Sequence, residues 1–388
     1  MQFALTPEQE LIREVARGFF DEKASSAKMR AALQTSAGYD LNLWAAMAHE
    51  MGWAGIAIPE AYGGAGLGMV ELSILQHELG RRLVPSPFFS TVCVAAPLVA
   101  AIADESQKAE LLGHIARGEV RVAVALTGRR GLPGCEGITA ELRASRGRYQ
   151  LTGESGLVIH ARACDVILVA ARAPGTKGRE GVSVVCLDAS GAGITVEELV
   201  MLDLTRRMSL LRFDNVEIER DAVLGESETA GDALENALDL ARIALAAEAV
   251  GGAEWTLEMT CAYTKQRIQF ARSIGSFQAV KHRLADMMVL LEAARSASWY
   301  AACVVDELEG EIAEAAAIAK ACCCDAFYRC AADAIQLHGG IGFTWEHDAH
   351  LYFKRARAVA SLFGSPAWQR EKLASLMGLG ATVASPGF

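Results

Sequence analysis

The sequence predicts an α+β protein of several domains: an N-terminal α-helical domain over residues 1–120, a central antiparallel β-barrel over 121–225 and a C-terminal four-helix bundle over 226–388. Two observations predict this order. The middle of the chain breaks into short β-rich runs separated by Gly, Pro and Asp turns, whereas both flanks carry long stretches with helical spacing of apolar residues. With 388 residues, the chain is long enough to bury a large core.

The N-terminal part opens with a clear helix start. Thr6-Pro7-Glu8-Gln9 is a capping box with proline at the first helical position, and apolar residues follow on one face. The glycine-rich stretch 59–66 lacks the strand, loop and helix context of a phosphate-binding motif, so we expect a plain loop there. Further helices are predicted over 41–51, 69–79 and 106–117.

The central part is predicted to form a compact antiparallel barrel or sandwich. Its apolar, β-branched runs are short and end at turn residues, as strands of such sheets do. The predicted strands are 122–126, 149–152, 166–170, 182–187, 194–198 and 209–216.

The C-terminal part is predicted to consist of long helices. The stretch 229–269 contains no proline and could form one helix about 60 Å long. Gly251-Gly252 in its middle would weaken an isolated helix, so we expect another helix to cross closely there. Gly339-Gly340 should form a left-handed C-terminal cap, and Ser365-Pro366 should start a short last helix. The other predicted helices are 276–308, 312–337 and 347–362.

Composition and charge exclude several classes of protein. The formal net charge is −10 and no basic stripe is present, so a nucleic acid is not an expected partner. The first residues lack the basic and apolar segments of a signal peptide, and no uncharged apolar run reaches the length of a membrane span. We therefore expect a soluble cytoplasmic protein that does not act at a membrane.

Cysteine and histidine clusters do not predict a metal site. Cys322-Cys323-Cys324 lie in an alanine-rich helical stretch, where adjacent side chains point about 100° apart and cannot converge on one ion. The cluster 346–350 has no H-E-x-x-H spacing and is better explained as the start of a helix. We expect reduced, mostly buried thiols and no metal.

Two long motifs carry a resemblance to a known family. Residues 263–287 read YTKQRIQFARSIGSFQAVKHRLADM, and residues 336–352 read QLHGGIGFTWEHDAHLY. With the order helices, barrel and bundle, they resemble the acyl-CoA dehydrogenase family over essentially the whole chain. The sequence of the second motif is most similar to that of actinobacterial enzymes that act on steroid side-chain CoA thioesters.

The resemblance implies FAD as cofactor, an acyl-CoA substrate desaturated between its α and β carbons, and electron-transfer flavoprotein as electron acceptor. It also implies a tetramer in which each FAD lies across a subunit interface. One subunit cradles the isoalloxazine ring and the substrate, and its neighbour grips the pyrophosphate and adenosine. The residues that match the neighbour's contacts are Arg267 for the pyrophosphate, Phe270 on the adenine side, Phe277 and Gln278 beside the flavin, and Gln336, Gly339 and Gly340 at the adenosine end.

The other half of the site departs from the family. Only Thr127 in the stretch 126–135 matches the family's Thr-Glu-Pro-x-x-Gly-Ser-Asp, and Leu157-Val158-Ile159 replaces its Trp-Ile-Thr. In the turn that carries the family's catalytic glutamate, Tyr-Glu-Gly-Thr, Phe363 stands in the place of the glutamate. Ser365 stands in the place of the threonine and remains a cofactor-binding candidate.

A second position for the base is known in the family, on the long helix just before a matching arginine. Here that arginine is Arg242 and the preceding residue is Ala241, so both base positions are empty. Glu248 is a weak candidate, because it lies two turns further along the same face, about 10 Å away. Asp239 points away from the Ala241 face. Pairing with a buried arginine is the better expectation for Glu248.

Three functions remain open at this stage. The first is a base-lacking subunit of an α2β2 acyl-CoA dehydrogenase, which lends its half of the FAD site to a catalytic partner. The second is a self-sufficient homotetrameric dehydrogenase with Glu248 or another carboxylate as its base. The third is a flavin-free scaffold protein. The first is favoured because the departures from the family's residues are confined to one half of the FAD site.

Overall fold

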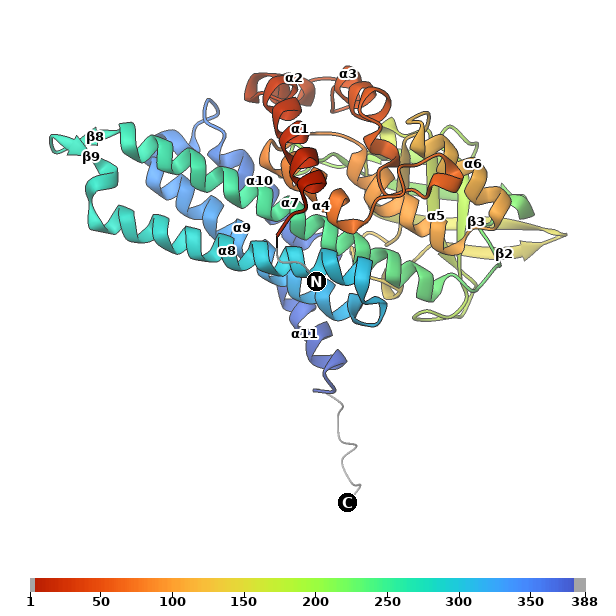
Figure 1. Ribbon diagram of the computed structural model, residues 1–388. Helices are drawn as coiled ribbons and strands as arrows, with labels where there is room; N and C mark the ends of the chain where they lie inside the picture. Colours follow the sequence, from red (N-terminus) through yellow and green to blue (C-terminus); the bar gives the residue numbers. More distant parts are fainter. Residues whose placement is uncertain (1–3, 380–388) are drawn as a thin grey trace.

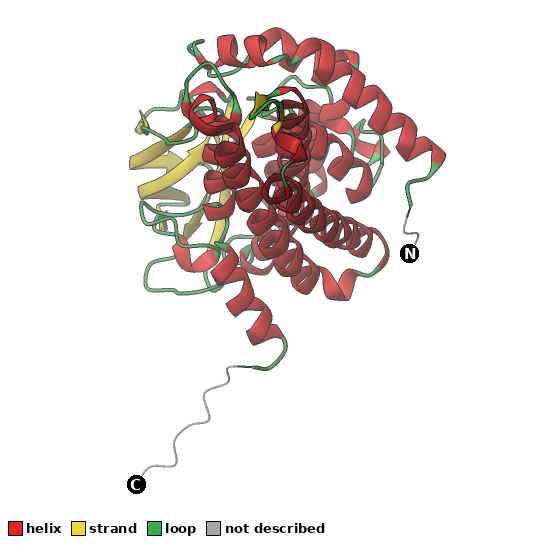
Figure 2. Cartoon of the chain, turned by 90° about the vertical axis from the view of Figure 1, so that its left-hand side faces the viewer, coloured by secondary structure: helices red, strands yellow, loops and turns green. Residues whose placement is uncertain are grey.

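The computed structural model describes residues 4–379. Figure 1 shows the sheet at one end of the molecule and three long helices running away from it. These are α7 (Gly231–Gln266), α8 (Gln278–Glu307) and α9 (Ile312–His338). Seen from the side, the strands lie against one flank of the helical mass (Figure 2).

The N-terminal part consists of helices joined by loops. At its start, the Thr6 hydroxyl accepts a hydrogen bond from the Gln9 backbone N–H at 3.3 Å, and the Gln9 side chain accepts one from the Thr6 N–H at 3.0 Å. This confirms the predicted capping box. We did not predict α2 (Ser26–Leu33), η4 (Phe89–Ala95) or α5 (Ala96–Ile102). A proline lies at the second position of α5, where a helix tolerates it. The helices are α1 (Pro7–Lys23), α2 (Ser26–Leu33), α3 (Leu41–Ala45), α4 (Met69–Arg81), α5 (Ala96–Ile102) and α6 (Glu105–Ala116), with π-helical segments η1 (Ala46–Glu50) and η4 (Phe89–Ala95).

The central sheet is mixed, which corrects the prediction of a purely antiparallel barrel. β1 (Val122–Ala125) runs parallel to β4 (Val166–Arg172), with Val122 opposite Val166. A parallel pair needs a long crossover connection, and the chain supplies one through β2 and β3. β2 (Glu141–Ser145) is largely polar and was not predicted. The remaining strands are β3 (Arg148–Ile159), β5 (Val182–Asp188), β6 (Ile194–Glu198) and β7 (Met208–Ile218).

The sheet order places β3 beside the strand that precedes the bundle. The order is β1-β4-β2-β3-β7-β6, and β5, which lies outside this order, pairs with β4. A further antiparallel bridge joins Thr127 to Gly156, just beyond the end of β1. This bridge brings two of the rewritten stretches of the sequence, 126–135 and 157–159, side by side.

The C-terminal helices pack around α9. α10 (Ala349–Ser361) and α11 (Pro366–Leu376) complete this part, and a small hairpin, β8 (Ile268–Gln269) and β9 (Arg272–Ser273), joins α7 to α8. Gly339 ends α9 with φ +66° and ψ −144°, a conformation open to glycine but outside the left-handed helical region that we predicted. Ser365 caps α11 as predicted, its hydroxyl accepting from the Trp368 N–H at 3.3 Å.

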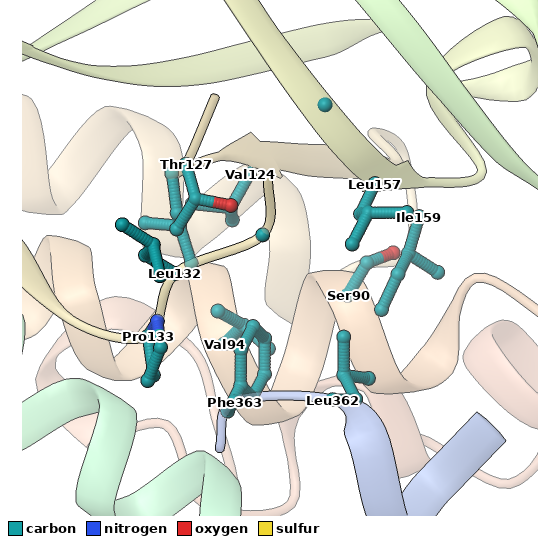
Figure 3. A pocket seen from close by; sticks show the side chains of 13 residues that line it. Ser90, Val94, Val124, Thr127, Leu132, Pro133, Leu157, Ile159, Leu362 and Phe363 are labelled. Carbon is teal, nitrogen blue, oxygen red and sulfur yellow. The ribbon is translucent and has the colours of Figure 1, made fainter. Parts of the chain in front are cut away.

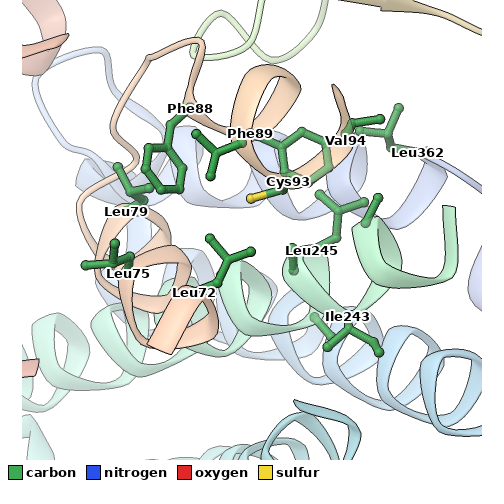
Figure 4. Close-up of a cluster of buried hydrophobic side chains, with 14 of the residues drawn as sticks. Leu72, Leu75, Leu79, Phe88, Phe89, Cys93, Val94, Ile243, Leu245 and Leu362 are labelled. Carbon is green, nitrogen blue, oxygen red and sulfur yellow. The ribbon is translucent and has the colours of Figure 1, made fainter. Parts of the chain in front are cut away.

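The close helix crossing predicted at Gly251-Gly252 is confirmed. A Cβ atom on Gly251 would lie 1.9 Å from the His77 carbonyl oxygen of α4. A Cβ atom on Gly252 would lie 2.4 Å from the Phe327 ring of α9. The two glycines therefore let α7 pack directly against α4 on one side and α9 on the other. Figure 4 shows the buried cluster beside this crossing, in which Leu72 of α4, Cys93 of η4 and Leu245 of α7 meet.

Within residues 4–379, one helix is long and apolar enough by composition to cross a membrane, namely α8. Only 39% of its most apolar window is buried, and Met288, Val289 and Leu290 are exposed. A helix face covered by another subunit has the same composition, so this is weak evidence for a membrane span.

Candidate functional site

The rewritten stretches of the sequence converge on one pocket. It lies between the sheet, η4 and the turn after α10, and Figure 3 shows Leu132, Leu157 and Phe363 around a common central space. The cavity measures only about 30 Å³, which is room for one or two water molecules. Its walls are Ser90, Val94, Val124, Leu126, Thr127, Gly131, Leu132, Pro133, Gly156, Leu157, Ile159, Leu362 and Phe363.

Phe363 is held in an unusual backbone conformation at the floor of this pocket. Its φ is +56°, a value that non-glycine residues rarely adopt. Its carbonyl oxygen accepts hydrogen bonds from Arg242 Nε and Gln369 Nε2, both at 3.0 Å. Its ring stacks on Phe89 of η4, with centroids 6.1 Å apart. Arg242 and Gln369 therefore fix the main chain of this turn, and Phe89 packs against the aromatic side chain.

A fully buried lysine donates hydrogen bonds to carbonyl groups at the same turn. Lys320 of α9 donates to the Val359 carbonyl oxygen at 2.8 Å and reaches the Gly364 carbonyl oxygen at 3.5 Å. The carbonyl groups at the end of α10 carry partial negative charge, which an ammonium group offsets. Lys320 thus fixes the end of α10 and the Phe363 turn to the same helix.

Neither family position for the base carries a carboxylate, and the nearest one on α7 is engaged elsewhere. Ala241 is buried, and the adjacent Arg242 has no exposed surface. Asp239 Oδ1 accepts from Arg242 Nη1 and from Lys372 Nζ, both at 2.6 Å. Burial lowers the pKa of Lys372. Asp239 therefore serves as the counter-ion of two cations.

Glu248 is paired with buried arginines, as we expected. Its Oε2 accepts from Arg206 Nη2 at 2.6 Å and its Oε1 from Arg355 Nη1 at 2.9 Å. Burial alone would raise the pKa of Glu248, but the two guanidinium groups outweigh it and hold the pKa below its ordinary value of 4.5. Arg355 also contacts Asp203 at 2.8 Å. A carboxylate stabilised in this way is a poor acceptor for a substrate proton.

The residues that match the neighbour's FAD contacts lie on the surface around the hairpin between α7 and α8. Arg267 caps α7, and Gln278 begins α8. Both are exposed, and within residues 4–379 no ion pair or side-chain hydrogen bond engages Arg267. Phe270 is 87% exposed, and its ring meets Phe277 edge to face at 6.2 Å.

The end of α9 joins this surface. The Tyr263 ring of α7 stacks on His338 at 4.4 Å, and its hydroxyl donates to the His338 carbonyl oxygen at 3.3 Å. This contact sets the exposed residues Gln336, Gly339 and Gly340 beside the end of α7. A Cβ atom on either glycine would meet nothing within 4 Å, so this turn faces open space.

The two groups of predicted site residues lie at opposite ends of the bundle. Ala241 and Arg267 are separated by about 40 Å along α7, at 1.5 Å per residue. Figure 1 shows the β8–β9 hairpin at the end of the molecule away from the sheet. A single chain therefore does not bring its closed pocket and its exposed contact surface together.

Comparison with known proteins identifies the family. Models of the acyl-CoA dehydrogenase N-terminal domain and C-terminal domain match residues 6–119 and 231–377. Acyl-CoA dehydrogenase IpdE2 of Mycobacterium tuberculosis is 33% identical over 364 residues, covering 93% of this chain and 95% of that protein. The chain belongs to the acyl-CoA dehydrogenase family. The family's enzymes are FAD-dependent oxidoreductases that act on CH–CH groups.

Two solved structures of this family are similar in fold. The ChsE4–ChsE5 complex from Mycobacterium tuberculosis matches with a TM-score of 0.87 at 25% identity, covering 97% of this chain and 99% of that chain. A variant of the Tcur3481–Tcur3483 steroid acyl-CoA dehydrogenase matches with a TM-score of 0.84 at 30% identity, covering 96% and 98%. The helix, sheet and bundle order predicted from the sequence is that of the acyl-CoA dehydrogenase fold.

FAD fits one half of this acyl-CoA dehydrogenase site and not the other. The exposed guanidinium of Arg267 and the open glycine turn can receive a pyrophosphate and a nucleoside. The pocket at Phe363, lined in part by Leu157 and Phe363, measures about 30 Å³ and is too small for a tricyclic ring. Leucine and isoleucine at 157 and 159 also offer no hydroxyl to a flavin.

Sequence reasoning missed the residues that keep the pocket closed. Phe89 stacks on Phe363, and the Arg206 guanidinium lies 4.8 Å above the Phe89 ring. Arg355 and Lys320 act from helices far along the chain. No local pattern marks these side chains, since they are recognised only by what they meet in the folded state.

Proposed function

We propose that this chain is a base-lacking subunit of an FAD-dependent acyl-CoA dehydrogenase. It lends the adenosine- and pyrophosphate-binding half of an FAD site to a catalytic partner in an α2β2 tetramer. The observation that carries the proposal is the contrast between the two halves: one is filled by the chain's own side chains, and the other is exposed and unengaged.

The closed half supports the absence of catalysis in this chain. An isoalloxazine ring and a thioester need a volume of several hundred Å³, as small-molecule sites usually have. The cavity of about 30 Å³ at Phe363 offers far less. Opening it requires moving the Phe363 ring off Phe89, while the Phe363 main chain is held by hydrogen bonds from Arg242 and Gln369. Phe363 and Ala241, at the two predicted positions of the base, offer no group that could remove a substrate proton.

The exposed half supports binding in trans. The planar, permanently charged guanidinium of Arg267 suits a pyrophosphate, and the Phe270 ring offers a face for adenine. Phe277, Gln278, Gln336 and the Gly339-Gly340 turn surround them. In a complete site, FAD would supply the acceptor for the hydride that leaves the β carbon of the substrate. This chain's residues bind and orient the distant end of that cofactor.

The substrate and further partners follow from similarity. One structural relative is described as a steroid acyl-CoA dehydrogenase and another as a two-protein complex. A steroid side-chain CoA thioester is therefore our proposed substrate, with its pocket in the partner subunit and electron-transfer flavoprotein as acceptor. The exposed apolar face of α8 around Met288 and Val289 is a surface for subunit contact, and the assembly is proposed to be cytoplasmic.

The test is the FAD content of the chain expressed alone and together with the dehydrogenase encoded beside it. We expect no FAD in the lone chain and one FAD per two chains in the complex. In the complex, Arg267→Met should weaken FAD retention about 10- to 100-fold, the value of one or two charge-assisted hydrogen bonds. Arg212→Met, at an exposed arginine of β7, is the matched control and should leave retention unchanged.

The alternatives give different results in the same experiment. One FAD per lone chain, with turnover, would overturn the proposal and support a self-sufficient homotetramer with Glu248 or another carboxylate as base. A colourless preparation with every dehydrogenase tested would support a flavin-free scaffold.

A further inference from the structure

A second cavity lies behind the wall of the closed pocket. The helical segment η4–α5 separates the two: Ser90 and Val94 face the pocket at Phe363, whereas Val92, Cys93 and Ala96 face the second cavity. The second cavity measures about 430 Å³, more than ten times the volume of the first. It is thus of the size that small-molecule sites usually have.

Apart from Asp306, the lining of the second cavity is apolar, and it includes several small residues. Leu72 and Cys93, which meet in Figure 4, form part of its buried floor, and Ala100 lies on its exposed rim. Leu67, another lining residue, is 41% exposed. Small side chains such as alanine, glycine and proline leave the space that larger residues would fill. The surface that remains favours a hydrocarbon body.

One charged side chain stands at the rim. Among the residues that line the cavity, Asp306 of α8 is the single charged one, and no lysine, arginine or histidine accompanies it. Its Oδ1 accepts from the Met69 N–H at 2.8 Å and its Oδ2 from the Val70 N–H at 3.2 Å, so it closes the start of α4. Gly68 permits this approach, because a Cβ atom there would lie 2.5 Å from Asp306 Oδ2.

Asp306 retains the capacity to accept another hydrogen bond. Each carboxylate oxygen carries two lone pairs, and one backbone N–H occupies only one of them. A hydroxyl group placed at the rim would find an acceptor there, while its apolar body lay on the floor below. An anion would meet the carboxylate without any lining cation to offset the repulsion.

We propose that this second cavity binds a neutral molecule with a compact apolar body and a hydroxyl group, which donates to Asp306. The size of the cavity, its apolar floor and its single acceptor at the rim together define this class. The CoA part of an acyl-CoA is excluded by its phosphates. None of its lining residues is a proposed FAD contact, so this site is tested separately from the proposed function.

The probe for this site is 1-adamantanol, a neutral alicyclic alcohol, and 1-methoxyadamantane is its counterpart without a donor. Isothermal titration into the full-length chain should give saturable binding of the alcohol at one per chain. The ether should bind about tenfold more weakly, since it cannot donate to Asp306.

Ala100→Trp fills the cavity from its exposed rim and should weaken alcohol binding at least tenfold. Ala109→Trp is the matched control, at an exposed alanine of α6 outside the lining, and should bind as the wild type does. Leu67→Trp enlarges a second exposed lining residue and replaces Ala100→Trp if that variant fails to fold. The proposal would be overturned if the wild type showed no saturable binding of the alcohol. It would also be overturned if Ala100→Trp and Leu67→Trp both bound the alcohol as tightly as the wild type does. Equal affinity for alcohol and ether would overturn the role of Asp306.

Discussion

Replacing Glu248 by glutamine removes the carboxylate that joins two buried arginines. Arg355 retains a second carboxylate partner, Asp203 at 2.8 Å, but Arg206 loses its only carboxylate among the described residues. Both guanidinium groups are almost fully buried, so neither can recover its hydration. Removing one partner of a buried pair costs about 3–5 kcal/mol, because the remaining charge is left uncompensated. We expect Glu248→Gln to lower the free energy of unfolding by that amount.

Urea unfolding of the full-length chain, followed by tryptophan fluorescence, measures this difference. Asp232→Asn is the matched control on the same helix, because Asp232 pairs with Arg179 on the surface, and it should change stability by less than about 1 kcal/mol. If Glu248→Gln lowered the free energy of unfolding by less than about 1 kcal/mol, the structural role of Glu248 as partner of the two arginines would be refuted. Unchanged stability with loss of turnover by the lone chain would instead identify Glu248 as a catalytic base.

The same pair predicts a dependence on pH. Because the arginines hold the pKa of Glu248 below 4.5, its contribution is present above pH 4.5 and is lost as the pH falls through the folded-state pKa. The stability difference between the wild type and Glu248→Gln should therefore be constant near neutral pH and shrink under acid conditions. A difference that grew as the pH fell would contradict the sign of the shift.

Three further predictions concern other parts of the chain. Gly251→Ala should lower the unfolding free energy by at least about 3 kcal/mol, because its methyl group would overlap the main chain of α4. The control Gly18→Ala lies in open space on α1 and should raise the unfolding free energy by about 0.5–1 kcal/mol. Burial opposes protonation of His77, but hydrogen bonding to Glu254 raises its pKa above 6.5. The wild type should therefore exceed His77→Gln in unfolding free energy most below pH 6.5, and this difference should fall as the pH rises. The opposite trend would refute the pairing of His77 with Glu254. Burial raises the pKa of the Cys93 thiol, so a disulfide reagent should label it only after unfolding, and rapid labelling of the native chain would contradict its burial.

Local signals predicted much of the fold. The capping box at Thr6, the crossing at Gly251-Gly252 and the cap of the last helix at Ser365 depend on neighbouring residues or on residue size, and each is confirmed. The parallel pairing of β1 with β4 was missed. Strand direction is decided by the path of the connection, which carries no periodic pattern in the strands themselves.

For the site, similarity of motifs identified both the residues that face outward and the stretches that depart from the family. From the sequence by itself, this similarity predicts that Phe363 and Ala241 occupy the positions of the family's base and that Arg267 and Gly339 match its FAD contacts. Only the tertiary structure decided that the departures meet in one filled pocket, that Glu248 lies between Arg206 and Arg355, and that a larger cavity lies behind η4. The physical reason is that motifs record residue identity along the chain, whereas cavity volume and charge pairing depend on side chains brought together from distant segments.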